Sequence, residues 1–134
     1  MRRNILVLTV LLLLAFALLL VAQEKKEMKA ETIMGTLVDL SCYAKGGFLT
    51  NDHGGMKGCG TACVKGGLPV ALVDANKKVH FLGVASSGYA DYVGKEVRFT
   101  GSHGQHAANV FLPEKFEIKE GDKWMEKSLP KNMI

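Results

Sequence analysis

The sequence predicts a mostly β domain, a small five-stranded Greek-key barrel of the OB type, preceded by an apolar N-terminal helix. Two observations support this prediction. Short runs rich in β-branched residues alternate with turn residues, as in strands that are joined by tight turns. The expected elements also follow the order strand, long loop, hairpin, short helix, strand, loop, strand, which is the chain order of an OB barrel.

Length and composition fit one globular domain and argue against nucleic acid as a partner. The chain has 134 residues, of which 48% are hydrophobic and 22% charged, with a formal net charge of +4. Two of the basic residues lie in the first 22 residues, so the remainder carries a net charge of +2. This charge is small and mixed in sign, and the basic residues lack the interleaved aromatic side chains on which bases stack.

Residues 1–22 combine a short basic head with a long apolar run, which predicts export. Arg2 and Arg3 precede the apolar run 5–22, and the charged stretch 23–31 follows it. This pattern is typical of a signal peptide. An uncleaved anchor is the alternative, because a helix of this length spans about 27 Å, close to the thickness of a bilayer core. In both cases we expect residues 23–31 to be a tether and residues 32–134 to form an exported domain, either periplasmic or secreted, or anchored to the inner membrane through residues 5–22.

The first half of this domain reads as a strand, a long glycine-rich loop and a hairpin. Residues 32–40 have the β-branched, partly alternating pattern of a strand. The loop 41–68 follows, with eight glycines among residues 46–67 and a short helix expected at 56–65. The apolar runs 69–74 and 78–82, separated by turn residues, then predict a hairpin.

The second half predicts a short helix and a strand. A serine pair at the start, apolar residues spaced i, i+3, i+4 and a glycine at the end predict a helix over 86–93. Residues 96–100 alternate regularly between polar and apolar side chains, so we expect Val97 and Phe99 to face the core.

The last part of the chain predicts a loop and a further strand. We expect a loop at 103–108 and a strand at 109–119, in which Pro113 marks a bulge or an edge. Trp124 follows a turn, and we expect its ring to cover one end of the core.

Several motifs resemble those of small exported bacterial domains of OB-like fold. Residues 92–101 match the pattern Y-x-G-K-x-V-x-x-x-G, which leads into the fourth strand of such domains. Residues 38–43, the pair Cys59 and Cys63, and residues 67–70 are similar to a pattern V-D-L-x-C-Y, H-x-x-C-x-x-x-C, G-x-P-V in uncharacterised exported proteins. The resemblance covers about residues 35–101 and implies the fold and the compartment. Met56 stands where that pattern has its histidine, and His53 precedes it by three residues.

Three cysteines, Cys42, Cys59 and Cys63, lie in or beside the glycine-rich loop. If residues 59–63 are helical, the i, i+4 spacing directs Cys59 and Cys63 to the same side of the helix. Two thiolates placed in this way are suited to one soft metal ion, of the Zn²⁺ or Cu(I) type.

A disulfide is the competing interpretation of the cysteines. Thiols usually pair in an oxidising compartment, and a bridge from Cys42 to Cys59 or Cys63 would stabilise the loop by about 3 kcal/mol. An odd number of cysteines leaves one thiol unexplained in that case. A third interpretation is that the thiols take part in redox chemistry or act as nucleophiles.

The histidines and one aspartate complete the set of candidate ligands. His53 lies inside the cysteine loop, and His103 and His106 are three residues apart in the loop at 103–108. His80 lies in a hairpin strand, where we expect it to face solvent. Asp39 precedes the loop, and we expect its carboxylate to cap the following turn rather than to act as a base.

These residues lead to one site hypothesis. We expect Cys42, Cys59 and Cys63 to be metal ligands, with the fourth position taken by His53 or by the pair His103 and His106. The histidine pair would approach from the loop between the fourth and fifth strands, across the binding face of the barrel. No catalytic motif appears, so a binding module for Zn or Cu is favoured over an enzyme. The alternative is a disulfide-stapled domain that binds another protein of the cell envelope.

Overall fold

A computed structural model describes residues 29–130 of the chain. The predicted signal peptide or anchor at residues 1–22 and most of the predicted tether lie outside the described residues. Within residues 29–130, no helix is both long and apolar enough to cross a membrane.

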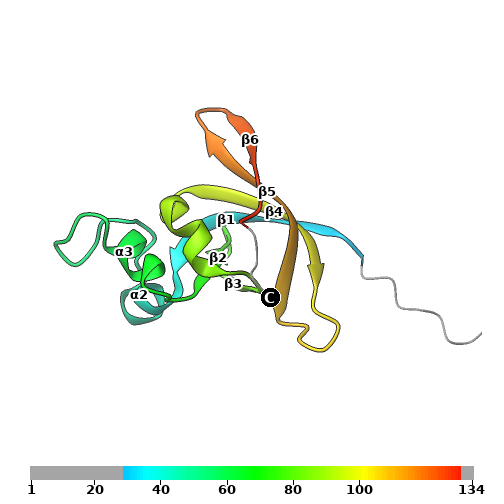
Figure 1. Cartoon of the computed structure of the whole chain (residues 1–134), viewed down its shortest axis with the longest axis horizontal. Coiled ribbons are helices and arrows are strands. Elements are labelled where there is room, and N and C mark those ends of the chain that lie inside the picture. The colour runs from blue at the N-terminus through cyan, green and yellow to red at the C-terminus, as the bar shows by residue number, and fades with distance from the viewer. Residues whose placement is uncertain (1–28, 131–134) are drawn as a thin grey trace, which may run out of the picture.

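Six strands form one mostly antiparallel sheet, which confirms the predicted mostly β class (Figure 1). Their spatial order is β3-β2-β1-β4-β5-β6, and a parallel pairing of β3 with β5 closes the first five into a ring. The strands span β1 Glu31–Asp39, β2 Val70–Val73, β3 Val79–Leu82, β4 Glu96–His103, β5 Val110–Glu120 and β6 Lys123–Lys127. The five predicted strands therefore exist, and β6, which continues β5 as a hairpin, is an additional one.

The core lies inside the strand ring and contains the residues that alternation had placed there. Val97 and Phe99 are fully buried, as predicted from the pattern of this strand. Phe99 stacks on Phe116 with ring centroids 4.9 Å apart, and Tyr89 meets both rings edge to face. Such aromatic contacts add to the free energy gained by burying apolar surface.

Strand β1 changes partner along its length, and this change positions the site. Residues 31–36 pair with β4, whereas residues 36–39 pair with β2. Gly35 sits at this change, where a Cβ atom would collide with the carbonyl oxygen of Val73. The far end of β1 thus leaves β4 and leads directly into the insertion between β1 and β2.

Two short α-helices occupy this insertion, and one of them was not predicted. Helix α2 spans Leu40–Gly46 and helix α3 spans Cys59–Lys65, within the range where a helix was expected. Helix α2 begins at the Asp39 N-cap and ends at Gly47, which adopts the left-handed conformation with φ 67°. Glycine is favoured there because it has no Cβ. Figure 1 shows both helices together at one end of the sheet.

The predicted helix after β3 is a 3₁₀ helix, η1, at Ser86–Tyr92. The hydroxyl of Ser86 accepts a hydrogen bond from the backbone N–H of Val70 at 3.2 Å, so it joins η1 to β2 instead of capping the helix. The bulge expected near Pro113 is present as a register shift between Thr100 and Gly101 of β4.

Two side chains lie elsewhere than predicted. His80 was expected to face solvent but is only 7% exposed, and its Nε2 lies 3.1 Å from Asp74 Oδ2. The short hairpin brings Asp74 next to the imidazole. No periodicity in the sequence indicates this contact. Trp124 lies on β6 with its ring over the Arg98 guanidinium at 4.6 Å, and it is half-buried.

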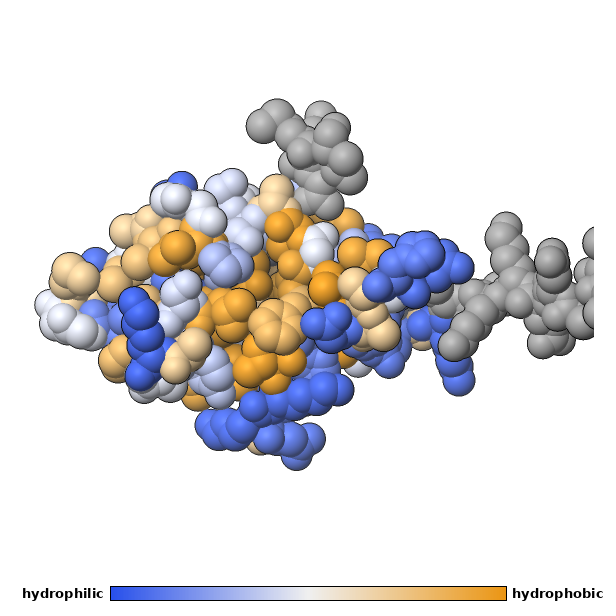
Figure 2. Space-filling view, turned by 90° about the horizontal axis from the view of Figure 1, so that it is seen from below, coloured by the Kyte–Doolittle hydropathy of each residue, from blue (hydrophilic) through white to orange (hydrophobic). Residues whose placement is uncertain are grey.

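Large apolar side chains also remain on the surface of the described chain. Figure 2 shows apolar side chains across the middle of one face, with charged side chains along its edge. Seven large apolar residues are exposed, namely Met34, Phe48, Met56, Leu68, Phe81, Leu112 and Met125. Phe48, Met56 and Leu68 belong to the insertion that holds the cysteines.

Candidate metal-binding site

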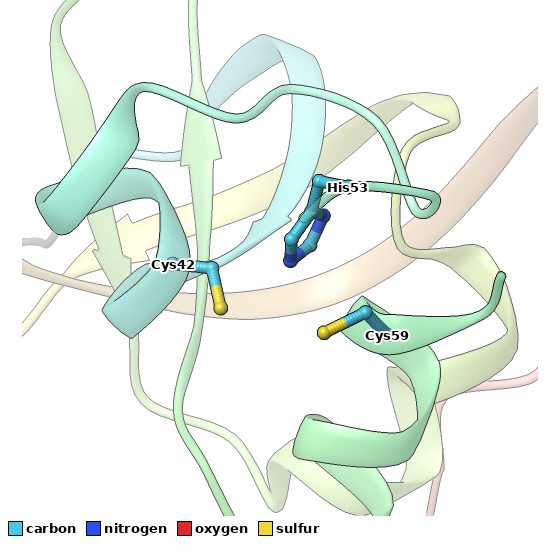
Figure 3. A group of neighbouring side chains, drawn as sticks. All are labelled: Cys42, His53 and Cys59. Carbon is cyan, nitrogen blue, oxygen red and sulfur yellow. The ribbon is translucent and has the colours of Figure 1, made fainter. Parts of the chain in front are cut away.

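The three cysteines converge between α2, α3 and the loop that joins them. Ligand atoms of Cys42, His53 and Cys59 lie within 4.8 Å of one another, and so do those of Asp39, Cys42 and Cys63. Figure 3 shows the sulfur atoms of Cys42 and Cys59 facing each other across a gap, with the imidazole of His53 directed into it. Cys42 belongs to both groups, so the five side chains form one cluster that could hold a metal ion.

Cys42 is positioned by the cap of α2. Asp39 Oδ1 accepts hydrogen bonds from the backbone N–H groups of Ser41 at 2.8 Å and Cys42 at 3.2 Å. This N-cap satisfies N–H groups that have no partner inside the helix. The predicted capping role of Asp39 is therefore confirmed. Because the cap starts the helix at Leu40, it places Cys42 in the first turn, beside the carboxylate.

Cys59 and Cys63 are positioned by α3, which is anchored to the core on its opposite side. Val64 is fully buried, and Gly60 lies so close to η1 that a Cβ atom would be 2.6 Å from Val93 Cγ1. Thr61 Oγ1 donates a hydrogen bond to the carbonyl of Ala90 at 3.0 Å. With one side held in this way, the helix directs its cysteines toward α2, as the i, i+4 spacing predicted.

The loop before α3 is fastened at both ends by side chains. Asn51 Oδ1 accepts a hydrogen bond from the backbone N–H of Thr61 at 2.8 Å, and its carbonyl accepts one from Gly60 at 3.0 Å. Asp52 Oδ1 accepts a hydrogen bond from the N–H of Gly58 at 2.7 Å. These bonds fold the segment back on itself, so that His53 between them faces the cysteines.

His53 is held in the orientation and tautomer of a metal ligand. Its Nδ1 lies 2.8 Å from the carbonyl oxygen of Thr50, which can only accept, so Nδ1 carries the proton. The ring also stacks on Phe48, with centroids 4.8 Å apart and an interplanar angle of 8°. The lone pair therefore resides on Nε2, which is buried and has no hydrogen-bond partner among the described residues. Metal-binding histidines commonly donate their other N–H to a carbonyl in this way.

Burial and charge disfavour thiolates at this site when no cation is present. The pKa of Cys63 is raised to about 12, mainly by burial. Hydrogen bonding and charge interactions with Asp39 and Cys59 add to this shift. The pKa of Cys42 is also raised, mainly by burial and then by its interactions with Asp39 and Cys59. A reactive cysteine shows the opposite shift of its pKa. A metal ion would supply the positive charge that thiolates require here.

The donor set and its spacing are compatible with Zn²⁺ and Cu(I). Tetrahedral zinc with bonds of about 2.3 Å to sulfur separates its sulfur ligands by about 3.8 Å. Within each of the two groups the ligand atoms are separated by up to 4.8 Å, so the side chains would have to move closer together to place all four donors around one ion. Sulfur and imidazole nitrogen are also the donors that both ions take in proteins.

The structure brings together four of the six predicted ligands and leaves two apart. His103 ends β4, where its Nε2 lies 2.8 Å from Glu31 Oε1. Glu31 begins β1 and Asp39 ends it, which separates the two by about 26 Å along the strand. His106 is exposed in the turn that follows His103. The expectation that this pair approaches the cysteines is not met, because β4 runs antiparallel to β1 and carries the turn to the opposite end of the sheet.

Asp39 is the one cluster member that the sequence did not identify as a metal-site residue. Its capping role was visible from its position three residues before Cys42. The second oxygen, Oδ2, is buried and has no hydrogen-bond partner among the described residues. Only the tertiary structure shows that a carboxylate oxygen of Asp39 lies within 4.8 Å of the sulfur atoms of Cys42 and Cys63.

Comparisons with known proteins add no family assignment to this geometry. The chain matches no protein-family model, and neither the curated proteins nor the solved structures contain a significant match.

Proposed function

We propose that this protein is a small exported domain that binds a soft or borderline metal ion through Cys42, Cys59, Cys63 and His53. One observation carries the proposal. The Nε2 atom of His53 is buried without a hydrogen-bond partner among residues 29–130, and the imidazole belongs to a group with the thiols of Cys42 and Cys59. A buried polar atom without a partner is costly, and a metal ion would satisfy it.

The construction of the insertion supports the same function. Helix α2 has no buried residue, and α3 buries only Gly60 and Val64. Two such short helices gain little free energy from apolar packing. A metal ion bound by α2, the loop and α3 would stabilise their packing against one another, as metal ions do in small metal-dependent domains.

We propose further that the domain is an OB-like barrel. In support, five strands form a ring that a parallel β3–β5 pairing closes, and η1 lies between β3 and β4 in the chain. The resemblance of the cysteine and G-x-P-V patterns to exported OB-like domains supports the same fold. The apolar run and basic head of residues 1–22 support export.

Metal titration of the reduced protein tests the function. We expect the reduced full chain, freed of metal, to bind one Zn²⁺ or Cu(I) ion per chain, measured against a chelator of known affinity. Cys63→Ser should abolish stoichiometric binding, whereas His106→Ala should leave it unchanged because His106 is exposed at the other end of the sheet. A reduced wild-type protein that binds neither ion would refute the proposal.

A disulfide-stapled interaction domain of the cell envelope is the second candidate. It is favoured by the position of Cys42, whose sulfur lies within 4.8 Å of ligand atoms on both Cys59 and Cys63. All three cysteines are free thiols in the structure. A thiol count on protein isolated without reductant or chelator separates the candidates. One free thiol without metal supports the staple, and three thiols that react only after denaturation support the metal site.

A further inference from the structure

We propose that Asp39 determines the metal preference of this site and makes it selective for a divalent ion, Zn²⁺, over Cu(I). The inference rests on the proposed metal-binding function. The starting observations are that Asp39 Oδ2 is buried and has no hydrogen-bond partner among the described residues, and that a carboxylate oxygen of Asp39 lies within 4.8 Å of the sulfur atoms of Cys42 and Cys63.

Asp39 has no protein cation to balance its charge. The residue is only 2% exposed, and none of the ion pairs found within residues 29–130 includes it. Its Oδ1 is occupied by the backbone N–H groups at the start of α2. A buried carboxylate without a countercharge is unfavourable, so proteins commonly pair such groups with cations or metal ions.

Capping alone does not explain a carboxylate at this position. Serine, threonine and asparagine cap helices about as well as aspartate and carry no charge. What aspartate adds is a second oxygen and a negative charge, on a carboxylate group that has an oxygen within 4.8 Å of the sulfur atoms of Cys42 and Cys63.

The charge of the ion decides which metal this arrangement favours. Three thiolates and one carboxylate carry four negative charges, of which Zn²⁺ neutralises two and Cu(I) only one. The Asp39 carboxylate attracts a divalent ion twice as strongly as a monovalent ion at the same position. A carboxylate oxygen is also a harder donor than sulfur and suits Zn²⁺ better than Cu(I).

The test is the substitution Asp39→Asn, which keeps the cap and removes the charge. The affinities of the full-length reduced protein for Zn²⁺ and for Cu(I) are measured by competition with chelators. Loss of a supporting carboxylate typically weakens metal binding about 10- to 100-fold. We expect a loss of that size for Zn²⁺ and, because Cu(I) has half the charge, a loss of about 3- to 10-fold for Cu(I). The ratio of the two affinities should therefore fall by about 3- to 10-fold.

Asp122→Asn is the control. Asp122 carries the same charge, but it is exposed in the turn between β5 and β6 and belongs to neither ligand group. We expect it to change either affinity by less than about twofold, since exposed charges are screened. Asp39→Ser, which also retains a capping oxygen, provides a second uncharged variant if Asp39→Asn does not fold.

The outcomes separate this inference from the proposed function. If the wild type binds both ions and the neutral variants at position 39 leave the affinity ratio unchanged, or Asp122→Asn shifts it equally, the role of Asp39 is refuted while metal binding stands. If the wild type binds neither ion, the proposed function fails and this inference fails with it.

Discussion

The rings of Phe48 and His53 stack with their centroids 4.8 Å apart and their planes within 8° of parallel. Phe48 is 40% exposed, so this contact contributes little to the core of the domain. Its effect is local: together with the hydrogen bond from Nδ1 to the Thr50 carbonyl, it fixes the imidazole in two directions. An aromatic residue at the loop surface thereby aligns a candidate ligand.

Removing this stacking partner should weaken metal binding more than it weakens the fold. Phe48→Ala frees the His53 ring, and we expect metal affinity to fall about tenfold, the lower range for groups that orient a metal ligand. The midpoint of urea unfolding of the metal-free protein should change little. Phe81→Ala is the control, since Phe81 is 42% exposed on β3 and should not affect metal affinity. Equal effects of the two substitutions would contradict an orienting role for Phe48.

His53 itself should be indispensable for tight binding, unlike the other loop histidines. His53→Ala removes the only imidazole in the cluster, and we expect metal affinity to fall at least about 100-fold, beyond the loss seen for supporting groups. His103→Ala and His106→Ala should bind metal like the wild type, because both lie at the opposite end of β1. Competition with a chromophoric chelator measures all three variants. A loss of affinity in His103→Ala would show that the site is assembled differently.

The close approach of α3 to η1 makes Gly60 a sensitive position. In Gly60→Ala, the new Cβ would lie 2.6 Å from Val93 Cγ1 and 3.1 Å from Asn51 Oδ1, so the helix must move. We expect a loss of about 1–3 kcal/mol in unfolding free energy, together with weaker metal binding. Urea denaturation and metal titration measure the two effects. Ala62→Ser, an exposed position on the same helix, should leave both near wild-type values.

The ion pair of Glu117 with Arg98 should make stability depend on acid pH. Arg98 donates two hydrogen bonds to Glu117, at 2.6 and 2.8 Å, and holds the pKa of that carboxyl at about 2, below its usual 4.5. A lowered pKa in the folded state stabilises the fold above the unfolded-state pKa, and this contribution disappears as the carboxyl becomes protonated. The stabilisation should therefore be complete above about pH 5 and fade between pH 4.5 and pH 2.

Glu117→Gln measures this contribution. We expect the variant to unfold at lower urea concentration than the wild type at pH 7, with the difference shrinking as pH falls below 4.5. Glu114→Gln is the control, because Glu114 is exposed on the same strand and should cause little change at either pH. A difference between Glu117→Gln and wild type that stays constant from pH 7 to pH 3 would contradict the ion-pair explanation.

Local patterns in the sequence were sufficient for much of the fold and half of the site. The alternation around Val97 and Phe99 predicted their burial, and the turn between residues 69–74 and 78–82 predicted the hairpin. The spacing of Cys59 and Cys63 predicted that both sulfurs share a side of α3, and the position of Asp39 predicted its cap. Each of these depends on residues a few positions apart, where backbone geometry alone relates the side chains.

Tertiary structure decided everything that joins distant segments. Sequence spacing did not distinguish His53 from His103 and His106 as the fourth ligand, because the choice depends on the direction in which β4 runs beside β1. The burial of His80, the extra strand β6 and the approach of the Asp39 carboxylate to Cys63 were not predicted for the same reason. Contacts between segments far apart in the chain arise from packing of the whole domain. A local sequence pattern therefore cannot predict them.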